Sequence, residues 1–382
     1  MNIKKMMTLG SLCLLSMNSA IATNYIYISN KEDGTISSYK LNEKTGKMTP
    51  TPMAVTYVGH NIASTVISPD RTYLYALTRD KPYMATSFKI KSETGDLIKY
   101  TQTEVPSSYA YNSLDRTGNY LLSASYDDDL VTVHKINQGK ILFPPIQTLR
   151  TLANAHAVIS DLKNKNIYAT SLSGQVIHQY SFNSTNGEIT SLTPAMVSVA
   201  PLTPRHLVTS HNNQYLYVLD ETSAKVISYK RDLNGGQLTQ IAISESLPPE
   251  STLKTGTPRG EWRSGNETLK PHAQPEQDIW AADIHITPDD RFLYTSERTN
   301  SLLTLFKIDA STGIPKRVNS IETEQQPRSF AITPNGKFLI STGEKSNLVS
   351  IYNIDQTSGY LTLNDRYPVG KNPIWVSIVD ID

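Results

Sequence analysis

The chain of 382 residues carries 36 lysines and arginines against 35 aspartates and glutamates, a formal net charge of +1. Without a basic excess, the composition gives no electrostatic reason to expect binding to nucleic acid or to an anionic membrane surface. The single cysteine, Cys13, excludes an intramolecular disulfide and a metal site built from cysteines. The 21 tyrosines against 7 phenylalanines favour half-buried strands, in which a ring packs on one side and its hydroxyl meets water.

The first 22 residues have the features of a signal peptide rather than of a folded segment. Lys4 and Lys5 precede an apolar run from Met6 to Met17, and Ala20-Ile-Ala22 provides a small-residue cleavage site. The apolar run is too short and too interrupted to span a bilayer well, so we expect no membrane span. We therefore predict export, to the periplasm if the host is Gram-negative, with residues 23–382 as the mature chain.

Seven copies of one strand pattern recur along the chain. In order they read Tyr25-Ile-Tyr-Ile28, Tyr73-Leu-Tyr-Ala76, Tyr120-Leu-Leu-Ser123, Asn166-Ile-Tyr-Ala169, Tyr215-Leu-Tyr-Val218, Phe292-Leu-Tyr-Thr295 and Phe338-Leu-Ile-Ser341. Successive copies start 46 to 49 residues apart, except for one interval of 77 residues. This period predicts an all-β fold, a seven-bladed β-propeller with four antiparallel strands in each blade. The long interval indicates an insertion at about 247–278 within a single domain of residues 23–382.

The two ends of the chain are expected to complete one blade together. The repeat at Tyr25 is a second strand, whereas the chain ends on an inner strand at Ile374-Trp-Val-Ser-Ile378. The last blade would then take three strands from the N-terminal end and one from the C-terminal end. Such closure removes the two exposed sheet edges that an open ring would leave.

Strand direction predicts which side chains share a rim of the propeller. The start of each inner strand and the loop from second to third strand lie on one rim, and turns such as Thr287-Pro-Asp-Asp290 lie on the other. The first rim surrounds the mouth of the central channel and collects Arg79, Tyr126, Arg205, His206, Glu221, Arg298, Arg328 and Lys345. The insertion at 247–278 lies over the same rim, and we interpret it as a cover.

Several arginines around one carboxylate suit a small anionic ligand, because arginine offers forked donors that match carboxylate or phosphate. Glu221 among arginines would stay ionised, and it could act as a general base on water or position a ligand hydroxyl. The alternative is that the same side chains are salt bridges that join neighbouring blades.

Motifs of several other site classes are absent from the sequence. It contains neither a Gly-x-Ser-x-Gly nucleophile elbow nor a His-Glu-x-x-His motif. The eight histidines show no metal-ligand spacing. We therefore expect no metal and no cofactor, and we expect a monomer.

Four longer motifs resemble those of a known family. They are Trp280-Ala-Ala-Asp-Ile-His-Ile-Thr-Pro-Asp289, Arg298-Thr-Asn-Ser-Leu302, Glu324-Gln-Gln-Pro-Arg-Ser-Phe330 and Gly370-Lys-Asn-Pro-Ile-Trp375. They look like the seven-bladed propeller 6-phosphogluconolactonases, whose wider group includes a carboxymuconate-lactonizing enzyme. The resemblance covers residues 24–380 apart from the insertion. It implies hydrolysis of a small anionic sugar lactone without a metal or a covalent nucleophile.

The resemblance also implies roles for individual residues. Its arginines correspond to Arg205 and Arg298, its glutamate to Glu221 and its histidine to His156, which are the candidate catalytic residues. The candidate substrate-binding residues are Arg328, Tyr126, His206 and Lys345. His156 precedes Ile159 by three residues, where the family has four, so we expect it to face the mouth only if a β-bulge lies between them.

Three functions are compatible with these observations. The first is hydrolysis of a sugar lactone at the arginine-rich mouth. The second is a non-catalytic exported propeller that binds a sugar acid or a protein partner on the same rim. The third, also suggested by the family, is ring closure or isomerisation of an unsaturated diacid.

Overall fold

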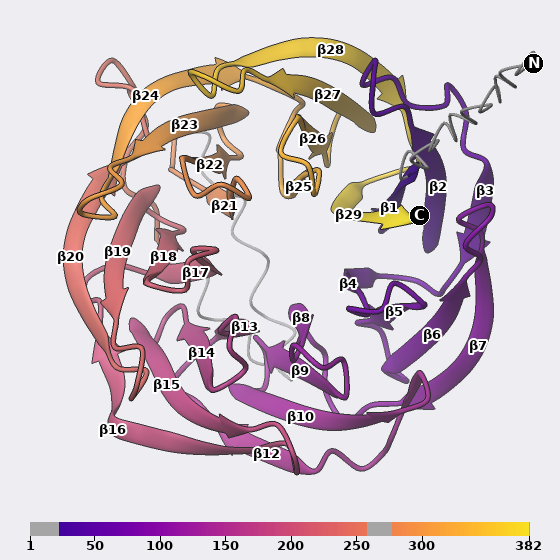
Figure 1. Ribbon diagram of the computed structural model, residues 1–382, viewed down its shortest axis with the longest axis horizontal. Helices are drawn as coiled ribbons and strands as arrows, with labels where there is room; N and C mark the ends of the chain where they lie inside the picture. The colour runs from indigo at the N-terminus through magenta and orange to yellow at the C-terminus, as the bar shows by residue number, and fades with distance from the viewer. Residues whose placement is uncertain (1–22, 258–276, 382) are drawn as a thin grey trace, which may run out of the picture.

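The computed structural model describes residues 23–257 and 277–381. Residues 1–22, the predicted signal peptide, and residues 258–276 of the predicted insertion lie outside this part. The described residues form seven antiparallel sheets arranged in a ring around a central axis, the axis of the predicted channel (Figure 1). This confirms the predicted all-β, seven-bladed propeller. In the described ranges, no helix is long and apolar enough to cross a membrane.

The strands of each blade run from the channel outwards. Blade 1 contains β4 (Ile62–Ile67), β5 (Tyr73–Thr78), β6 (Met84–Ile90) and β7 (Leu97–Glu104). Blade 2 contains β8 (Tyr111–Leu114), β9 (Tyr120–Ser125), β10 (Leu130–Asn137), β11 (Lys140–Ile141) and β12 (Gln147–Arg150). Blade 3 contains β13 (Ala155–Ser160), β14 (Asn166–Ser171), β15 (Val176–Asn183) and β16 (Glu188–Ser198), and blade 4 contains β17 (Pro204–Thr209), β18 (Tyr215–Asp220), β19 (Lys225–Arg231) and β20 (Leu238–Glu245).

The remaining three blades follow the same plan. Blade 5 contains β21 (Ala281–Ile286), β22 (Phe292–Glu297), β23 (Leu302–Ile308) and β24 (Pro315–Glu322). Blade 6 contains β25 (Phe330–Ile332), β26 (Phe338–Gly343), β27 (Leu348–Ile354) and β28 (Leu361–Pro368). Blade 7 contains β29 (Pro373–Ile381), β1 (Thr23–Asn30), β2 (Thr35–Leu41) and β3 (Ala54–Tyr57).

Blade 7 joins the two ends of the described chain. Its inner strand β29 pairs with β1 along the whole length of β1, from Thr23 opposite Ile381 to Asn30 opposite Pro373. Apolar side chains of both strands enter the cores shared with blades 1 and 6. The predicted closure, with three strands from one end and one from the other, is therefore confirmed.

Blade 2 departs from four equal strands. Its outer strand is split in two, so that β11 pairs with Ile136 and Asn137 while β12 pairs with the segment from Leu130 to Val133. The peptide bond between Phe143 and Pro144, in the interval between the two pieces, is cis. The expected pattern thus holds for the inner three strands of this blade and is interrupted in the fourth.

One capping interaction recurs in the turns between inner and second strands. The first turn residue accepts a hydrogen bond from the backbone N–H that begins the second strand, as from Phe292 N to Thr287 Oγ1 (3.1 Å) and from Tyr120 N to Asp115 Oδ1 (2.9 Å). Serine, threonine and aspartate all carry a short oxygen acceptor that can close such a turn. The same position is held by Ser68, Asp161, Ser210 and Thr333.

The repeat tyrosines are more deeply buried than the composition suggested. In four blades the tyrosine at the third position of the repeat does not meet water but donates its hydroxyl to a glycine carbonyl of the next blade. The pairs are Tyr27 and Gly95, Tyr168 and Gly236, Tyr217 and Gly313, and Tyr294 and Gly359, at 2.6–2.8 Å. These glycines have φ between 69° and 85°, where a side chain would be strained. A Cβ atom at Gly313 would also lie 2.3 Å from the Tyr215 ring. The tyrosines therefore join blade to blade.

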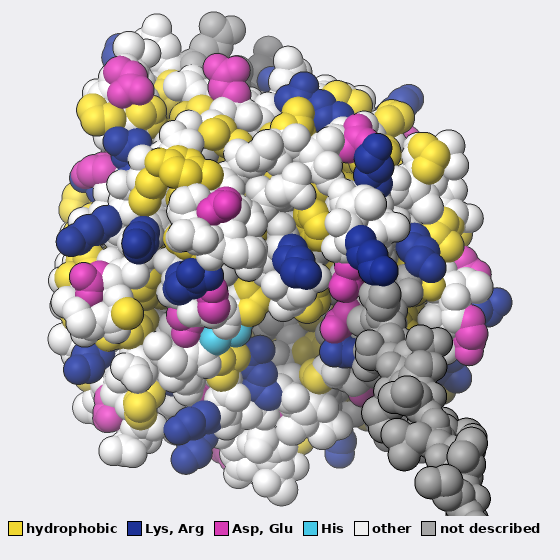
Figure 2. Space-filling model, turned by 45° about the horizontal axis from the view of Figure 1, so that its top comes forward, with side chains coloured by type: hydrophobic (Ala, Val, Ile, Leu, Met, Phe, Trp, Pro, Cys, Tyr) yellow, Lys and Arg dark blue, Asp and Glu magenta, His cyan; other side chains and the backbone are white. Residues whose placement is uncertain are grey.

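Charged side chains of both signs are distributed over the surface. In Figure 2, lysines and arginines are intermixed with aspartates and glutamates across the face shown. This matches the balanced composition, in which 36 basic side chains face 35 acidic ones. The expectation that the chain does not bind nucleic acid stays a prediction.

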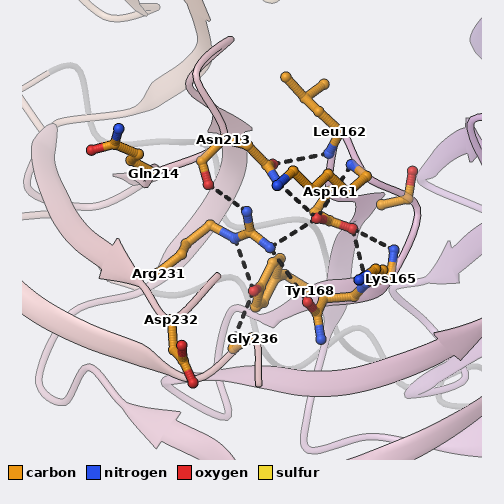
Figure 3. A network of polar contacts seen from close by, with 12 residues as sticks. Asp161, Leu162, Lys165, Tyr168, Asn213, Gln214, Arg231, Asp232 and Gly236 are labelled. Atoms are coloured by element: carbon orange, nitrogen blue, oxygen red, sulfur yellow. Dashed lines mark hydrogen bonds and ion pairs between the residues drawn. The ribbon is translucent and has the colours of Figure 1, made fainter. Parts of the chain in front are cut away.

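A buried ion pair joins blades 3 and 4 at the turn that follows β13 (Figure 3). Asp161 Oδ2 accepts from Arg231 Nη2 at 3.0 Å and from Asn213 Nδ2 at 2.9 Å. Arg231 also donates through Nε to the Tyr168 hydroxyl at 3.0 Å. The side chains of both charged residues are almost fully buried, with exposed fractions of 1% and 2%. The turn that follows β13 is therefore held by a buried ion pair in addition to its capping hydrogen bond.

The hydrogen bonds at Asp161 stabilise its ionised form. Burial by itself would raise the pKa of Asp161. Donors from Asn213 and from the backbone of Asn166 and Lys165, together with the charge of Arg231, outweigh burial and hold this pKa below its usual value. A depressed carboxyl pKa contributes stability above the unfolded-state pKa, and that contribution is lost as the pH falls through the folded-state pKa.

We predict that Asp161→Asn destabilises the fold in a pH-dependent way. At pH 7 the variant leaves Arg231 as an unpaired buried charge, which should cost about 3–5 kcal/mol of unfolding free energy. The difference from the wild type should shrink below the unfolded aspartate pKa of about 3.9. Urea denaturation at pH 7 and pH 3 measures both values. Asp289→Asn, whose ion pair with Arg291 is exposed, is the control and should change stability by less than about 1 kcal/mol. If the variant and the wild type differed by the same unfolding free energy at both pH values, this account would be contradicted.

We also predict that a chain ending at Asn372 does not fold. It lacks β29, so β1 would present an unpaired edge and the cores of blades 1, 6 and 7 would lose apolar contacts such as that of Val376. Circular dichroism during heating should show no cooperative transition in the truncated chain. A retained transition near the wild-type melting temperature would rule out the closing role of β29.

Candidate functional site

Three aromatic rings meet inside the channel. Tyr111 of β8, His206 of β17 and Trp375 of β29 come from blades 2, 4 and 7, none of which are neighbours in the ring. The ring centroids are 5.1 Å apart for Tyr111 and His206, 5.7 Å for Tyr111 and Trp375, and 6.1 Å for His206 and Trp375. Side chains of non-neighbouring blades can touch only across the channel, so these rings close it. We refer to Tyr111, His206 and Trp375 as the channel floor.

The three floor residues share one position in the blade register. In each blade, one inner-strand residue pairs with the fourth residue of the repeat, as Leu207 pairs with Val218 and Val376 with Ile28. Each floor residue is the one directly before that inner-strand residue. The corresponding pair in blade 2 is Asn112 with Ser123. Equal register places the three rings at one height. The residues nearer to the start of each inner strand therefore lie above the floor, towards the mouth.

His156 reaches the mouth because β13 contains the required bulge. Ala155 pairs with Ser171 and Ala157 with Thr170, which leaves His156 as the extra residue between them. Its ring lies 5.2 Å from that of His206 and 5.8 Å from that of Tyr126. The shorter spacing in the sequence is thus compensated, and His156 joins the predicted cluster.

His156 has an unsatisfied nitrogen. Only 6% of the residue is exposed, and its Nδ1 atom is buried without a hydrogen-bond partner in the part of the chain that the structure describes. Burial, followed by the charges of Arg205 and His206, lowers the pKa of His156 well below its usual value. The imidazole is therefore neutral at pH 7, and a buried polar atom of this kind is stabilised when a ligand supplies its partner.

Glu221 is held by donors from the next blade. Its Oε1 atom accepts from Arg298 Nη2 at 2.8 Å and from Trp280 Nε1 at 2.6 Å. The Arg298 guanidinium also lies over the Trp280 ring, 3.6 Å from its centroid. Glu221 follows β18 of blade 4, whereas Arg298 follows β22 of blade 5. Glu221 and Arg298 thus form a salt bridge between neighbouring blades, as the alternative interpretation predicted, and this salt bridge lies at the mouth.

Arg205 lies on the other side of Glu221. Its Nη1 atom contacts His206 Nε2 at 3.0 Å and donates to the carbonyl of Ala282. Its Nε atom is 3.9 Å from Glu221 Oε2, and this buried nitrogen has no hydrogen-bond partner among the described residues. Burial and the charge of Arg328 lower the pKa of Arg205 to about 10, so it stays charged at neutral pH. The site therefore contains a second buried polar atom without a partner.

The other predicted residues differ in how closely they join this cluster. Arg328 Nε lies 3.9 Å from Glu344 Oε1, and the charge of Arg328 lowers the pKa of Arg205 and His156. Lys345 is exposed, and its side chain makes no hydrogen bond or ion pair with residues in the described ranges. The structure brings Arg328 and His206 to the mouth but does not connect Lys345 to it.

Sequence reasoning gave no role to several residues that the structure places here. Asp283 binds His206, Trp280 binds Glu221, and Tyr111 and Trp375 complete the floor. Trp280, Asp283 and Trp375 belong to the longer family-like motifs, so the sequence contained a signal from which they could have been identified. Tyr111 carried no signal of its own, because it is one of 21 tyrosines. In the described part of the chain, no group of three or more His, Cys, Asp or Glu side chains could hold a metal ion.

Comparison with known proteins shows the family. The model of a family described as "Lactonase, 7-bladed beta-propeller" matches residues 19–378. A 6-phosphogluconolactonase of Serratia proteamaculans is 35% identical over 82% of this chain and 87% of its own length. One of Pectobacterium carotovorum is 32% identical over 94% and 99%. The solved structure of a periplasmic gluconolactonase from Pseudomonas aeruginosa shares the fold, with a TM-score of 0.81 and 21% identity over 95% of this chain and all of that one. The chain therefore belongs to the seven-bladed β-propeller lactonase family.

Proposed function

We propose that the chain hydrolyses a sugar lactone at the mouth formed by His156, Arg205, Glu221 and Arg298. Membership of the lactonase family makes it an enzyme of the lactone-hydrolase kind. The observation that carries the proposal is the pair of buried, unpartnered nitrogens, His156 Nδ1 and Arg205 Nε, in one cluster. Unsatisfied buried polar atoms cost free energy unless a ligand satisfies them.

The reaction needs a stabilised oxyanion and a proton acceptor. In hydrolysis, a water oxygen attacks the lactone carbonyl carbon, the ring C–O bond breaks, and the ring oxygen takes up a proton to give the hydroxy acid. In this proposal Arg205 donates to the carbonyl oxygen as that oxygen gains negative charge, and Arg298 is a second cation nearby. Neutral His156 can accept the proton of the attacking water. Glu221 holds Arg298 and balances the charge of the two arginines.

Two substrates are candidates, one from the curated relatives and one from the predicted export. The curated relatives at 35% and 32% identity are named 6-phosphogluconolactonases, which makes 6-phosphoglucono-δ-lactone the first candidate. Arg328 adds positive charge near the mouth. Lys31 is a second cation close to Arg328, because burial and the charge of Arg328 lower the pKa of Lys31. A phosphate group would be attracted by such charge. The predicted export favours a lactone without phosphate, such as glucono-δ-lactone.

The test is lactone hydrolysis by purified residues 23–382. Proton release near pH 7 is followed for 6-phosphoglucono-δ-lactone and glucono-δ-lactone, with the uncatalysed rate subtracted. We expect acceleration of at least one of the two. No acceleration of either would overturn the hydrolase proposal. Calorimetric titration with the corresponding acids would then decide whether the mouth is the binding site of a non-catalytic propeller.

We further predict that Arg298→Lys loses turnover while the fold persists. Lysine keeps the positive charge beside Glu221 but loses the forked donors and the contact with the Trp280 ring. Loss of such a donor should lower kcat about 10²-fold. Arg291→Lys in the same blade is the matched control. Arg291 is exposed, its one ion pair among the described residues is with the neighbouring Asp289, and it also donates to the carbonyl of Gln356. Unchanged kcat in Arg298→Lys would exclude Arg298 from the reaction.

A further inference from the structure

Asp283 is a buried carboxylate that the reaction itself does not require. It lies on β21 at the register position of the floor residues, one before Ile284, which pairs with Thr295. Its Oδ1 atom accepts from His206 Nδ1 at 2.7 Å and from Ile284 N at 3.0 Å. Its Oδ2 atom contacts His285 Nε2 at 3.2 Å and accepts from Phe330 N at 3.3 Å. Both oxygens are thus saturated by donors.

These contacts fix the charge of Asp283. Burial alone would raise its pKa, but His285 and His206 hold the pKa of Asp283 well below its usual value. An ionised carboxylate can only accept hydrogen bonds. The 2.7 Å contact therefore requires a proton on His206 Nδ1.

The proton on Nδ1 determines what His206 can offer to Arg205. Burial and the charge of Arg205 lower the pKa of His206 to about 4, against the opposing effect of Asp283, so the ring is neutral at pH 7. A neutral imidazole with its proton on Nδ1 has a free lone pair on Nε2. Arginine can only donate, so the 3.0 Å contact between Arg205 Nη1 and His206 Nε2 is a hydrogen bond in this tautomer alone.

The same contact sets the orientation of the guanidinium. Nη1 is occupied by His206 Nε2 and by the carbonyl of Ala282. The Nε edge of Arg205 is left unpartnered, 3.9 Å from Glu221 Oε2. A donor stabilises an oxyanion well only when it is oriented before the reaction begins.

We propose that Asp283 is a positioning residue that acts through His206: it selects the His206 tautomer that orients Arg205 for the lactone carbonyl. The expected effect on kinetics rests on the proposed function, whereas the His206 tautomer does not depend on it. His206 is accordingly a positioning group, and of these two histidines only His156 has a ring nitrogen without a partner among the described residues.

The tautomer can be measured without any substrate. Long-range proton–nitrogen correlation spectra of ¹⁵N-labelled protein distinguish the two neutral forms of histidine, and the signal missing in His206→Phe identifies His206. We expect the proton on Nδ1 in the wild type. A proton on Nε2 in the wild type would overturn the proposal. The tautomer can be determined even if the wild type hydrolyses no lactone. That outcome would refute the proposed function without deciding which tautomer His206 adopts.

The kinetic test uses Asp283→Asn. An amide can accept on only one of its two atoms, so the variant loses either the partner of His206 or that of His285 and Phe330. We expect kcat to fall at least about tenfold with KM changed far less, because the loss is one of orientation in the transition state. Unchanged kcat would overturn the proposal. If the variant does not fold, His206→Phe replaces it, with the same expected loss.

A matched control pair lies on the opposite rim. Asp290 accepts from His211 Nδ1 at 3.1 Å and from two backbone N–H groups, so the pair resembles Asp283 and His206 in chemistry. It is less buried, because the His211 side chain is 46% exposed and that of Asp290 17%. Asp290→Asn should keep kcat within about twofold of the wild type, because no contact links it to Arg205. An equal loss in both variants would show a general structural effect and overturn the positioning role.

Discussion

The pairing of β1 with β29 is the constraint on which the channel depends. Seven blades enclose a channel of fixed width only if the first and last strands meet. This pair runs in register from Thr23 to Ser29, and after a register shift Asn30 lies opposite Pro373. The closed ring brings Tyr111, His206 and Trp375 into contact from three non-neighbouring blades. The floor of the site is therefore a consequence of closure, because no single blade contains its parts.

Charge balance is the second constraint on the mouth. Arg205 and Arg298 are each 1% exposed, and two buried cations are tolerated only with compensating carboxylates. Glu221 forms an ion pair with Arg298 directly, whereas Asp283 is separated from Arg205 by the His206 ring that it binds. The mouth therefore uses its carboxylates to retain cations, and the donors that remain unpaired are available for an anion or an oxyanion.

The sequence predicts the fold further than it predicts the site. The repeat period and the position of Tyr25 and Ile374 suffice for seven blades and their closure, because both depend on periodicity alone. Strand direction also places Arg205, Glu221 and Arg298 on one rim, where the structure has them in contact. Strand direction cannot distinguish Lys345 from these residues, although Lys345 is exposed on the same rim. Whether a side chain reaches the mouth depends on the path of its loop rather than on the strand pattern.

The remaining features of the site depend on contacts between blades. The bulge that turns His156 to the mouth is a property of the pairing of β13 with β14, and sequence spacing indicates only that one is needed. His156 and His206 are then neighbours with opposite states: both nitrogens of His206 are occupied by Asp283 and Arg205, whereas Nδ1 of His156 has no partner among the described residues. Two histidines whose ring centroids are 5.2 Å apart thus differ in hydrogen bonding, because His206 finds partners for both nitrogens and His156 does not find one for Nδ1.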